Sequence, residues 1–337
     1  MGKDKRCVIG IDVGGTKIMA VLYDPQFQPL TKARTKTRPH EGEKHFLGIL
    51  KDAVRQLLRE AHLDNDQIMG IGIGCPGIVQ ERRGVVLSSP NIQFLKNFPL
   101  AQKLSRATGL PVCAANDVKA GLYGEQQFGA AKGCRNVIGI FIGTGIGGAV
   151  IADGRMIYGA GGGAGEIGHI QVSPTGPICG CGKRGCLEAM ASRLSIASEA
   201  AALAARQQAP ALFRKAGTDV KDIRSGTLAK AIRSGDKVLE QLVRQKAQLI
   251  GSVLGNLVNV LNPEMAVLGG GLAEAMARYL VPNAKKAMLE TAMPALGKPV
   301  RVVAAKLGDY SVAAGAAKMA WDRFYPSPKR RKEDWHA

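Results

Sequence analysis

The feature that most constrains the fold is a strand–glycine turn–strand pattern that occurs twice. Apolar residues flank Gly14-Gly15 within residues 7–23, and the same order recurs around Gly147-Gly148 within residues 137–152. Each pattern is typical of a hairpin with a polar, glycine-rich tip. Because one supersecondary unit is used twice, we predict two related lobes, each opened by an antiparallel hairpin.

The remaining pattern alternates strands and helices. Apolar residues at helical spacing predict helices over residues 44–62, 237–261 and 310–321, and short apolar runs predict strands over 68–73, 112–115 and 265–268. This alternation indicates an α/β fold with mixed sheets flanked by helices. We predict a first lobe at 1–118, a second at 119–325 and a loose basic tail at 326–337, with the last helix packing back on the first lobe.

The charge balance is strongly basic, with 46 Lys and Arg against 27 Asp and Glu, a formal net charge of +19. A solvated basic surface explains most of it, while nucleic acid, polyphosphate or an acidic substrate are the alternatives. Part of the excess lies in the run Lys329 to Lys332. The longest apolar stretch, residues 137–152, contains glycines and is shorter than the roughly 20 residues that a membrane span needs. We expect no membrane association and a soluble, cytoplasmic protein.

Glycines bring backbone close to ligands, and 43 of the 337 residues are glycine, almost twice the usual ~7%. The first tip follows Asp12 and reads Gly14-Gly15-Thr16-Lys17; the second spans residues 143–148. Backbone N–H groups at such tips approach phosphates without interference from a Cβ, although either tip alone is equally a plain tight turn. Neither matches a P-loop or a dinucleotide-binding fingerprint. We therefore predict a phosphate held between the two lobes.

Asn116-Asp117 stands at the end of a predicted strand and before a helix. Both residue types are favoured helix N-caps, which is one interpretation. The other is a carboxylate that accepts a hydroxyl proton during phosphoryl transfer.

A cluster of metal-binding residue types comprises His169, Cys179, Cys181 and Cys186. Three thiolates and one imidazole complete a tetrahedral zinc shell, which predicts a structural zinc site. Glu166 and Glu188 flank this cluster. They are either unlinked surface acids or anchored carboxylates suited to hydrogen bonding a polyhydroxylated ligand. The other cysteines, Cys7, Cys75, Cys113 and Cys134, are predicted to be small core residues.

At these motifs the chain resembles the ROK family of sugar kinases, in the hexokinase–Hsp70–actin superfamily. The resemblance runs from Cys7 to Trp321. It is carried by IGIDVGGTKI (9–18), GIGCPGIV (72–79), NDVKAGLYGE (116–125), GIFIGTGIGGAV (139–150), GAGEIGHI (163–170), CGCGKRGCLE (179–188) and NPEMAVLGGGLAE (262–274).

The resemblance implies two actin-like (ribonuclease H-like) lobes with ATP and a sugar in the cleft between them. It assigns Asp12 to the neighbourhood of Mg²⁺ and phosphate, and Asp117 to the general base. Phosphate contacts are implied for Gly14, Gly15, Thr16, Lys17, Gly143, Thr144, Gly145, Gly147 and Gly148, and adenosine contacts for Gly269, Gly270 and Gly271. Sugar contacts are implied for Gly77, Asn91, Asn116, Asp117, Glu166, His169 and Glu188, and structural Zn²⁺ for His169, Cys179, Cys181 and Cys186.

The chain departs from the family pattern after the expected base, where Asn-Asp-Ala-Asn is usual and Asn116-Asp117-Val118-Lys119 stands here. Lys119 either lowers the pKa of the base or points to solvent, and we leave it unassigned.

The resemblance predicts an ATP-dependent hexose kinase that makes glucose 6-phosphate from glucose, and a homo-oligomer, dimer or tetramer. N-acetylglucosamine or N-acetylmannosamine is the alternative acceptor, and polyphosphate the alternative donor. A sugar-responsive transcriptional regulator is a further alternative. Because only six residues precede the first predicted strand, we expect no helix-turn-helix and no specific nucleic-acid binding.

Overall fold

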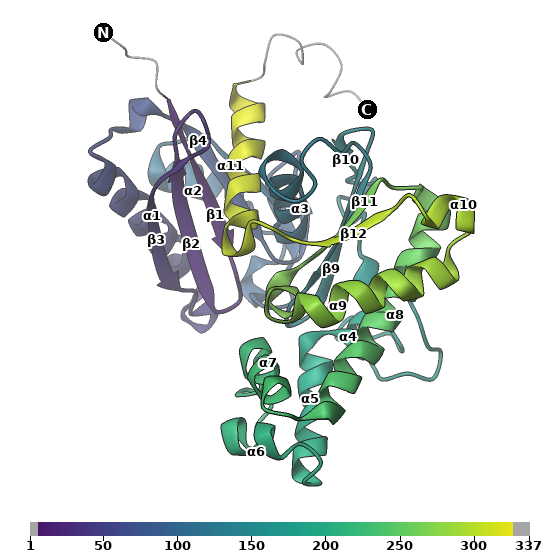
Figure 1. Ribbon diagram of the computed structural model, residues 1–337. Helices are drawn as coiled ribbons and strands as arrows, with labels where there is room; N and C mark the ends of the chain where they lie inside the picture. Colours follow the sequence, from purple (N-terminus) through teal and green to yellow (C-terminus); the bar gives the residue numbers. More distant parts are fainter. Residues whose placement is uncertain (1–5, 326–337) are drawn as a thin grey trace. The chain divides into compact units, whose positions relative to one another are not determined.

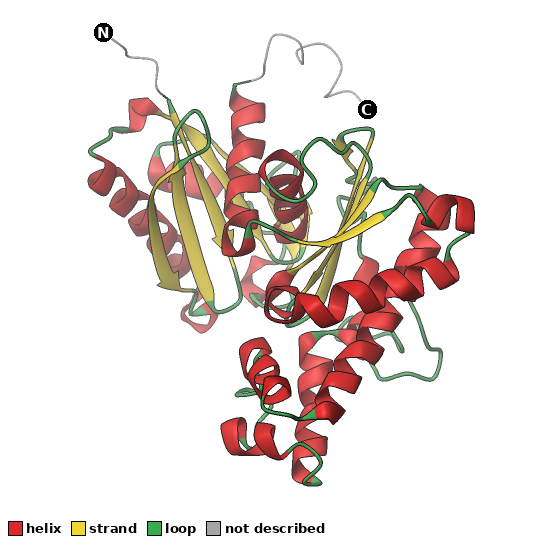
Figure 2. Cartoon of the chain, viewed as in Figure 1, coloured by secondary structure: helices red, strands yellow, loops and turns green. Residues whose placement is uncertain are grey.

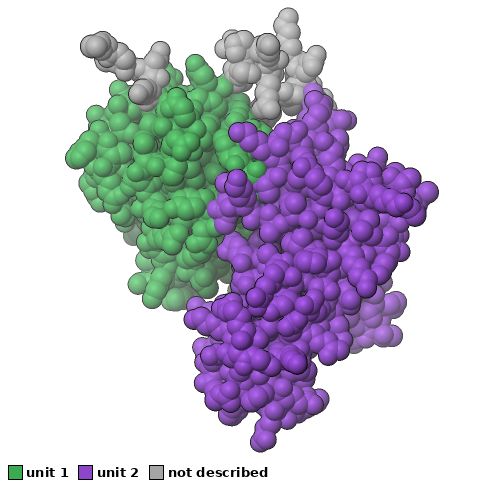
Figure 3. Space-filling view, viewed as in Figure 1, with its two compact units in different colours: residues 1–129, 158–164, 309–337 green, residues 130–157, 165–308 purple. Residues whose placement is uncertain are grey.

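The computed structural model describes residues 6–325 (Figure 1). The predicted basic tail at 326–337 lies outside the described residues. The chain divides into two compact units, coloured separately in Figure 3. Among the described residues, the first unit comprises 6–129, 158–164 and 309–325, and the second comprises 130–157 and 165–308. The boundary predicted at residue 118 falls inside a helix, and the first unit continues to Gly129.

The first unit is built on a five-stranded mixed sheet with the strand order β3-β2-β1-β4-β7 (Figure 2). Strands β1, β2 and β3 pair antiparallel, whereas β4 is parallel to both β1 and β7. Its strands are β1 (Cys7–Val13), β2 (Lys17–Tyr23), β3 (Pro29–Lys36), β4 (Ile68–Cys75), the small pair β5 (Ile78–Gln80) and β6 (Val85–Ser88), and β7 (Val112–Asn116). Its helices are α1 (Gly42–Ala61), α2 (Leu100–Thr108), α3 (Asp117–Phe128) and α11 (Ser311–Phe324).

Helix α11 packs directly on β1 and β4 of this first unit, although it comes from the other end of the chain. Two strand glycines make that contact possible. A Cβ at Gly10 would lie 1.9 Å from the carbonyl oxygen of Ala313, and one at Gly72 would lie 1.8 Å from that of Ala316. The helix backbone therefore rests against the strand backbone, where only glycine leaves room.

The second unit repeats the plan with the strand order β10-β9-β8-β11-β12. The β8–β9 hairpin is antiparallel, and β11 is parallel to both β8 and β12. Its strands are β8 (Val137–Ile142), β9 (Ile146–Ala152), β10 (Arg155–Met156), β11 (Met265–Gly269) and β12 (Arg301–Ala304). Its helices are α4 (Leu187–Ala191), α5 (Arg193–Ala205), α6 (Pro210–Ala216), α7 (Ser225–Arg233), α8 (Lys237–Leu261), α9 (Gly270–Thr291) and α10 (Pro294–Gly297).

The α/β class and the mixed sheets flanked by helices are thus confirmed, and the two sheets share one strand order. Each unit has its own apolar core: one is centred on β1, β4 and α1, and the other on β8, β11, α8 and α9. Helices α5, α6 and α7 lie at the end of the second unit that is remote from its sheet (Figure 1). Across residues 6–325, we find no helix with the length and apolar character that crossing a bilayer requires.

Candidate active site

The first glycine-rich tip, residues 14–17, closes the β1–β2 hairpin. The Gly14 N–H donates to the Lys17 carbonyl at 2.8 Å. Thr37 braces the tip from outside: its N–H donates to the Thr16 carbonyl at 3.1 Å and its hydroxyl to the Gly14 carbonyl at 2.6 Å. Thr37 is fully buried. It follows β3 and is 23 positions from Gly14 in the sequence, so no sequence motif indicates its role.

Asp12 lies near the end of β1, between Met19 of β2 and Gly74 of β4. Burial raises the pKa of its carboxyl to about 7, and the charges of Asp117 and Asp309 act in the same direction, while Lys17 opposes them. The ionised carboxylate is therefore costly in the free protein. A cation placed beside it would favour the ionised form.

Lys17, predicted to contact phosphate, pairs with an acid that sequence reasoning missed. Its Nζ donates to Asp309 Oδ1 at 2.9 Å, and Arg34 donates to Oδ2 of the same carboxylate at 3.2 Å. The bond from Lys17 holds the pKa of Asp309 below its ordinary value. Asp309 is 292 positions from Lys17 in the sequence, so no local pattern could have indicated the pair.

Asn116 ends β7 and Asp117 begins α3. The Asn116 side-chain oxygen accepts from the Lys119 N–H at 3.0 Å, which confirms that Asn116 caps the helix. Its Nδ2 donates to the Gly77 carbonyl at 3.0 Å and to Asp117 Oδ1 at 3.1 Å. Asp117 Oδ1 also accepts from the Val118 N–H at 2.9 Å. The cap thus orients the neighbouring carboxylate.

Two further residues predicted to bind sugar lie in the same unit. Gly77 has a φ of +110°, and a Cβ there would lie 2.0 Å from the Ser88 carbonyl oxygen, so this position requires glycine. Asn91 lies against the first tip: a Cβ at Gly15 would be 3.5 Å from the Asn91 Cβ. Lys119 does not point to solvent, because it is 2% exposed.

The second tip, residues 143–148, joins β8 to β9. The Gly143 N–H donates to the Gly145 carbonyl at 2.9 Å. Arg193, at the start of α5, donates from its backbone N–H to the Gly143 carbonyl at 3.0 Å and from Nη2 to Thr144 Oγ1 at 3.0 Å. Sequence reasoning missed Arg193, which lies outside the glycine-rich and cysteine-rich motifs.

The Gly269-Gly270-Gly271 run opens helix α9 beside this second tip. Gly270 has a φ of +82°, and a Cβ there would lie 2.6 Å from the carbonyl oxygen of Ile142, the last residue of β8. The structure therefore places two predicted nucleotide-binding segments next to each other. The N-terminus of a 22-residue helix at this position also favours negative charge.

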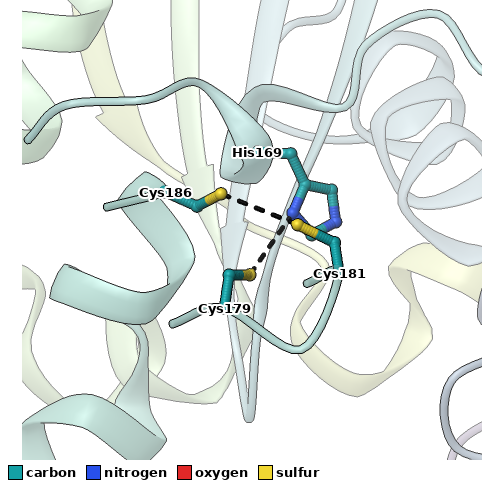
Figure 4. A group of neighbouring side chains, drawn as sticks. All are labelled: His169, Cys179, Cys181 and Cys186. Atoms are coloured by element: carbon teal, nitrogen blue, oxygen red, sulfur yellow. Dashed lines mark hydrogen bonds between the residues drawn. The ribbon is translucent and has the colours of Figure 1, made fainter. Parts of the chain in front are cut away.

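The four predicted zinc ligands point toward one another, as Figure 4 shows. Their ligand atoms all lie within 4.8 Å of one another. Cys181 Sγ is 3.7 Å from Cys186 Sγ, and Cys179 Sγ is 3.6 Å from His169 Nδ1. Bonds of about 2.3 Å to one tetrahedral zinc would separate sulfurs by about 3.8 Å, so this donor set fits Zn²⁺.

Both acids that flank the cluster lie close to its residues. His169 presents Nδ1 to the sulfurs, and its Nε2 lies 3.9 Å from Glu166 Oε2. Glu188 Oε1 lies 3.6 Å from Cys179 Sγ, and Oε2 accepts from the Ile146 N–H of the second tip at 2.8 Å.

The predicted site residues thus form two groups, one in each unit, and comparison with known proteins gives them a family. The sequence model of the ROK family matches residues 8–323. The chain belongs to the ROK family. This ROK protein is 34% identical over 282 residues to a glucokinase of Halalkalibacterium halodurans, covering 82% of this chain and 84% of the relative. It is also 34% identical over 268 residues to an N-acetylmannosamine kinase of Salmonella arizonae, covering 79% of this chain and 84% of that protein.

A solved structure extends the likeness to three dimensions. The ROK family glucokinase of Streptomyces griseus, in complex with glucose and AMPPNP, matches this ROK protein with a TM-score of 0.81 at 32% identity. The match covers 93% of this chain and 98% of the other. The actin-like architecture expected from the sequence is confirmed by this neighbour.

Proposed function

We propose that this chain is an ATP-dependent hexose kinase that converts glucose to glucose 6-phosphate. Its class, a sugar kinase, is supported by the glucokinase relatives in sequence and in structure. The observation that supports the reaction is the placement of two carboxylates, Asp12 and Asp117, in the first unit. Asp12 pairs with Gly74 of β4, and a Cβ at Gly74 would lie 3.5 Å from the Asp117 Cα. Phosphoryl transfer from Mg-ATP needs one carboxylate near the metal and a second carboxylate, acting as the base, near the sugar hydroxyl.

In this proposal Asp117 accepts the proton of the sugar 6-hydroxyl. At the same time the hydroxyl oxygen bonds to the γ-phosphorus of ATP, and the bond between that phosphorus and ADP breaks. Asn116 orients the base through its Nδ2. Asp12 would hold Mg²⁺ with the phosphates, which relieves the cost of its own ionisation. Positioning and charge neutralisation provide most of the catalysis in such reactions.

We assign nucleotide binding to the two tips and to the start of α9, and sugar binding to polar groups of both units. The phosphate-binding residues are Gly14, Gly15, Thr16, Lys17, Gly143, Thr144, Gly145, Gly147 and Gly148, with Gly269, Gly270 and Gly271 near adenosine. The sugar-binding residues are Gly77, Asn91, Asn116, Asp117, Glu166, His169 and Glu188.

Zn²⁺ would be held by His169, Cys179, Cys181 and Cys186, and its role is structural because four protein ligands leave no open position. The ion would fix the ring of His169 and the start of α4, which carries Glu188. We further propose a homo-oligomer, to be measured by sedimentation equilibrium, and no sequence-specific DNA binding.

N-acetylmannosamine is the second candidate acceptor, because a kinase of that sugar is as similar in identity as the glucokinase. The test is a steady-state assay with glucose, mannose, fructose, N-acetylglucosamine and N-acetylmannosamine, each with ATP and with polyphosphate. We expect the highest kcat/KM for glucose with ATP. A higher kcat/KM for an N-acetylhexosamine would identify that sugar, and not glucose, as the acceptor. If no sugar of the panel were phosphorylated, the proposed kinase activity would be refuted.

A further inference from the structure

Lys119 is a buried lysine that the proposed reaction leaves unexplained. It lies on the first turn of α3, two residues after Asp117, and is 2% exposed. Its Nζ donates to Glu81 Oε1 at 3.3 Å and to the Gly162 carbonyl oxygen, and it lies 5.4 Å from the centre of the Tyr158 ring. All of these residues belong to the first unit. The ammonium is therefore fully engaged in a confined setting.

Helix stability does not explain a lysine at this position. The first turn is the positive end of the helix dipole, where a cation is unfavourable. Burial adds a desolvation cost that an apolar side chain of similar length would avoid. We therefore look for the role of Lys119 in the residues that its ammonium group binds.

One of its partners, Glu81, also contacts the backbone beside the proposed base. Glu81 follows β5, and its side chain is 13% exposed. Burial raises the pKa of Glu81, whereas Lys119 and a hydrogen bond from the backbone of Asn116 act in the opposite direction. The Glu81 carboxylate thus meets the chain on both sides of Asp117, at residue 116 and at residue 119.

Its other partner, Gly162, lies in the loop 158–164, which belongs to the first unit while both flanking segments belong to the second. The loop is closed by the Ala164 N–H, which donates to the Tyr158 carbonyl at 3.0 Å. Gly162 has a φ of +82°, and a Cβ there would lie 2.4 Å from the Val79 carbonyl oxygen. The chain then continues through Gly165 to Glu166, a proposed sugar ligand.

We propose that Lys119 is a positioning residue for phosphoryl transfer. By binding Glu81 and the Gly162 carbonyl together, it fixes the start of α3 that carries Asp117 and the loop that leads to Glu166. This inference rests on the proposed kinase activity. A displacement of about 1 Å at a reacting group can cost on the order of 10²-fold in rate. Contacts that hold Asp117 in position therefore affect the rate of the chemical step.

The experiment replaces the charged pair with an apolar one, in the double variant Lys119→Met/Glu81→Leu. Such exchanges often leave stability unchanged or improved, whereas removal of one partner strands a buried charge. We expect the melting temperature to stay near that of the wild type and the single-turnover rate of phosphoryl transfer to fall by about 10- to 100-fold. The sugar KM should rise. The ATP KM should stay within about twofold of the wild-type value, because the substitutions leave the nucleotide-binding tips unchanged.

Two variants serve as comparisons. Lys103→Met removes another Lys–Glu pair of the same unit, in which Lys103 Nζ lies 2.5 Å from Glu43 Oε1, and should leave the rate unchanged. Lys119→Arg keeps the charge and the donors, and should retain more of the rate than the apolar pair does. If the apolar pair fails to fold, Glu81→Gln keeps the lysine and the shape, and should still lower the single-turnover rate.

A folded double variant with a single-turnover rate within about twofold of the wild type would overturn the inference, as would an unchanged rate in Glu81→Gln. Both outcomes presuppose an active wild type. A wild type that phosphorylates no sugar of the panel refutes the proposed function instead, so the two failures are distinguishable.

Discussion

Glu188 accepts a hydrogen bond from the Ile146 N–H at 2.8 Å, and its other oxygen lies 3.6 Å from Cys179 Sγ. One carboxylate therefore connects the second tip with the Cys/His cluster. Since Glu188 is also a proposed sugar ligand, a change in either neighbour should alter sugar binding.

Gly145→Ala should weaken sugar binding without unfolding the protein. The added methyl would lie 2.1 Å from Glu188 Oε2, so the carboxylate, as the end of a flexible side chain, must leave Ile146. We expect the sugar KM to rise about tenfold, which is the loss of one charge-assisted hydrogen bond. Gly226→Ala of the same unit is the control, because its methyl meets nothing within 4 Å, the position belongs to no proposed binding segment, and the sugar KM should stay unchanged. Equal sugar KM values in both variants would contradict the role of Glu188.

Cys181→Ser should lose zinc and sugar affinity together. Metal analysis of the wild type should give about one zinc per chain, and the variant should give almost none. Because the cluster orients His169 and adjoins Glu188, sugar affinity measured by calorimetry should fall about 10- to 100-fold. Cys113→Ser, a buried cysteine outside the cluster, should keep its zinc. Full zinc occupancy in Cys181→Ser, or an active wild type without zinc, would refute the site.

Asp117→Asn keeps the shape of the side chain and removes its basicity. We expect kcat to fall by at least ~10²-fold, the usual contribution of general-base catalysis, while calorimetry still detects sugar binding. Asp66→Asn makes the same exchange at an exposed position of the first unit and should have no effect. Near-normal turnover in a folded Asp117→Asn protein would exclude Asp117 as the base.

Asp12 should make the stability of the ligand-free protein depend on pH. Its pKa is raised to about 7 from an ordinary value of 3.8, so the folded state holds the proton more tightly than the unfolded chain does. Well below pH 3.8 both states are protonated and the residue costs nothing; the cost grows as the pH rises through 3.8 and is constant above about pH 7. Asp12→Asn should therefore gain about 3–5 kcal/mol in unfolding free energy at pH 8 relative to its effect at pH 4.

Urea denaturation at the two pH values measures this gain. Mg-ATP should stabilise the wild type more than the Asp12→Asn protein, because the proposed metal contact is lost. An identical effect of the substitution at pH 4 and at pH 8 would mean that Asp12 ionises freely in the folded chain.

Local patterns sufficed for much of the fold and for the zinc cluster. The apolar spacing over 44–62 became α1, and the repeated hairpins became the cores of two sheets with one strand order. The cluster was predictable because its three thiols lie within eight residues of one another, and thiols crowded in this way are typical of metal binding.

What the sequence did not indicate are partners brought together by tertiary structure. Lys17 meets Asp309, Thr37 braces the first tip, and Lys119 meets Glu81 and Gly162. Each pair is separated by 20 to almost 300 residues, so periodicity and motif spacing carry no signal of it. The extent of the first unit has a similar origin: it continues to Gly129 because α3 packs with α11, which the chain reaches only at its far end.

The position of α11 has a consequence for how the protein is made. Strands β1 and β4 leave the ribosome early, but the glycine surface that receives Ala313 and Ala316 stays uncovered until residue 324 has been synthesised. The second unit is complete by residue 308 and can close first. During that interval the nascent first unit presents apolar strand faces, which is the condition that holdase chaperones recognise.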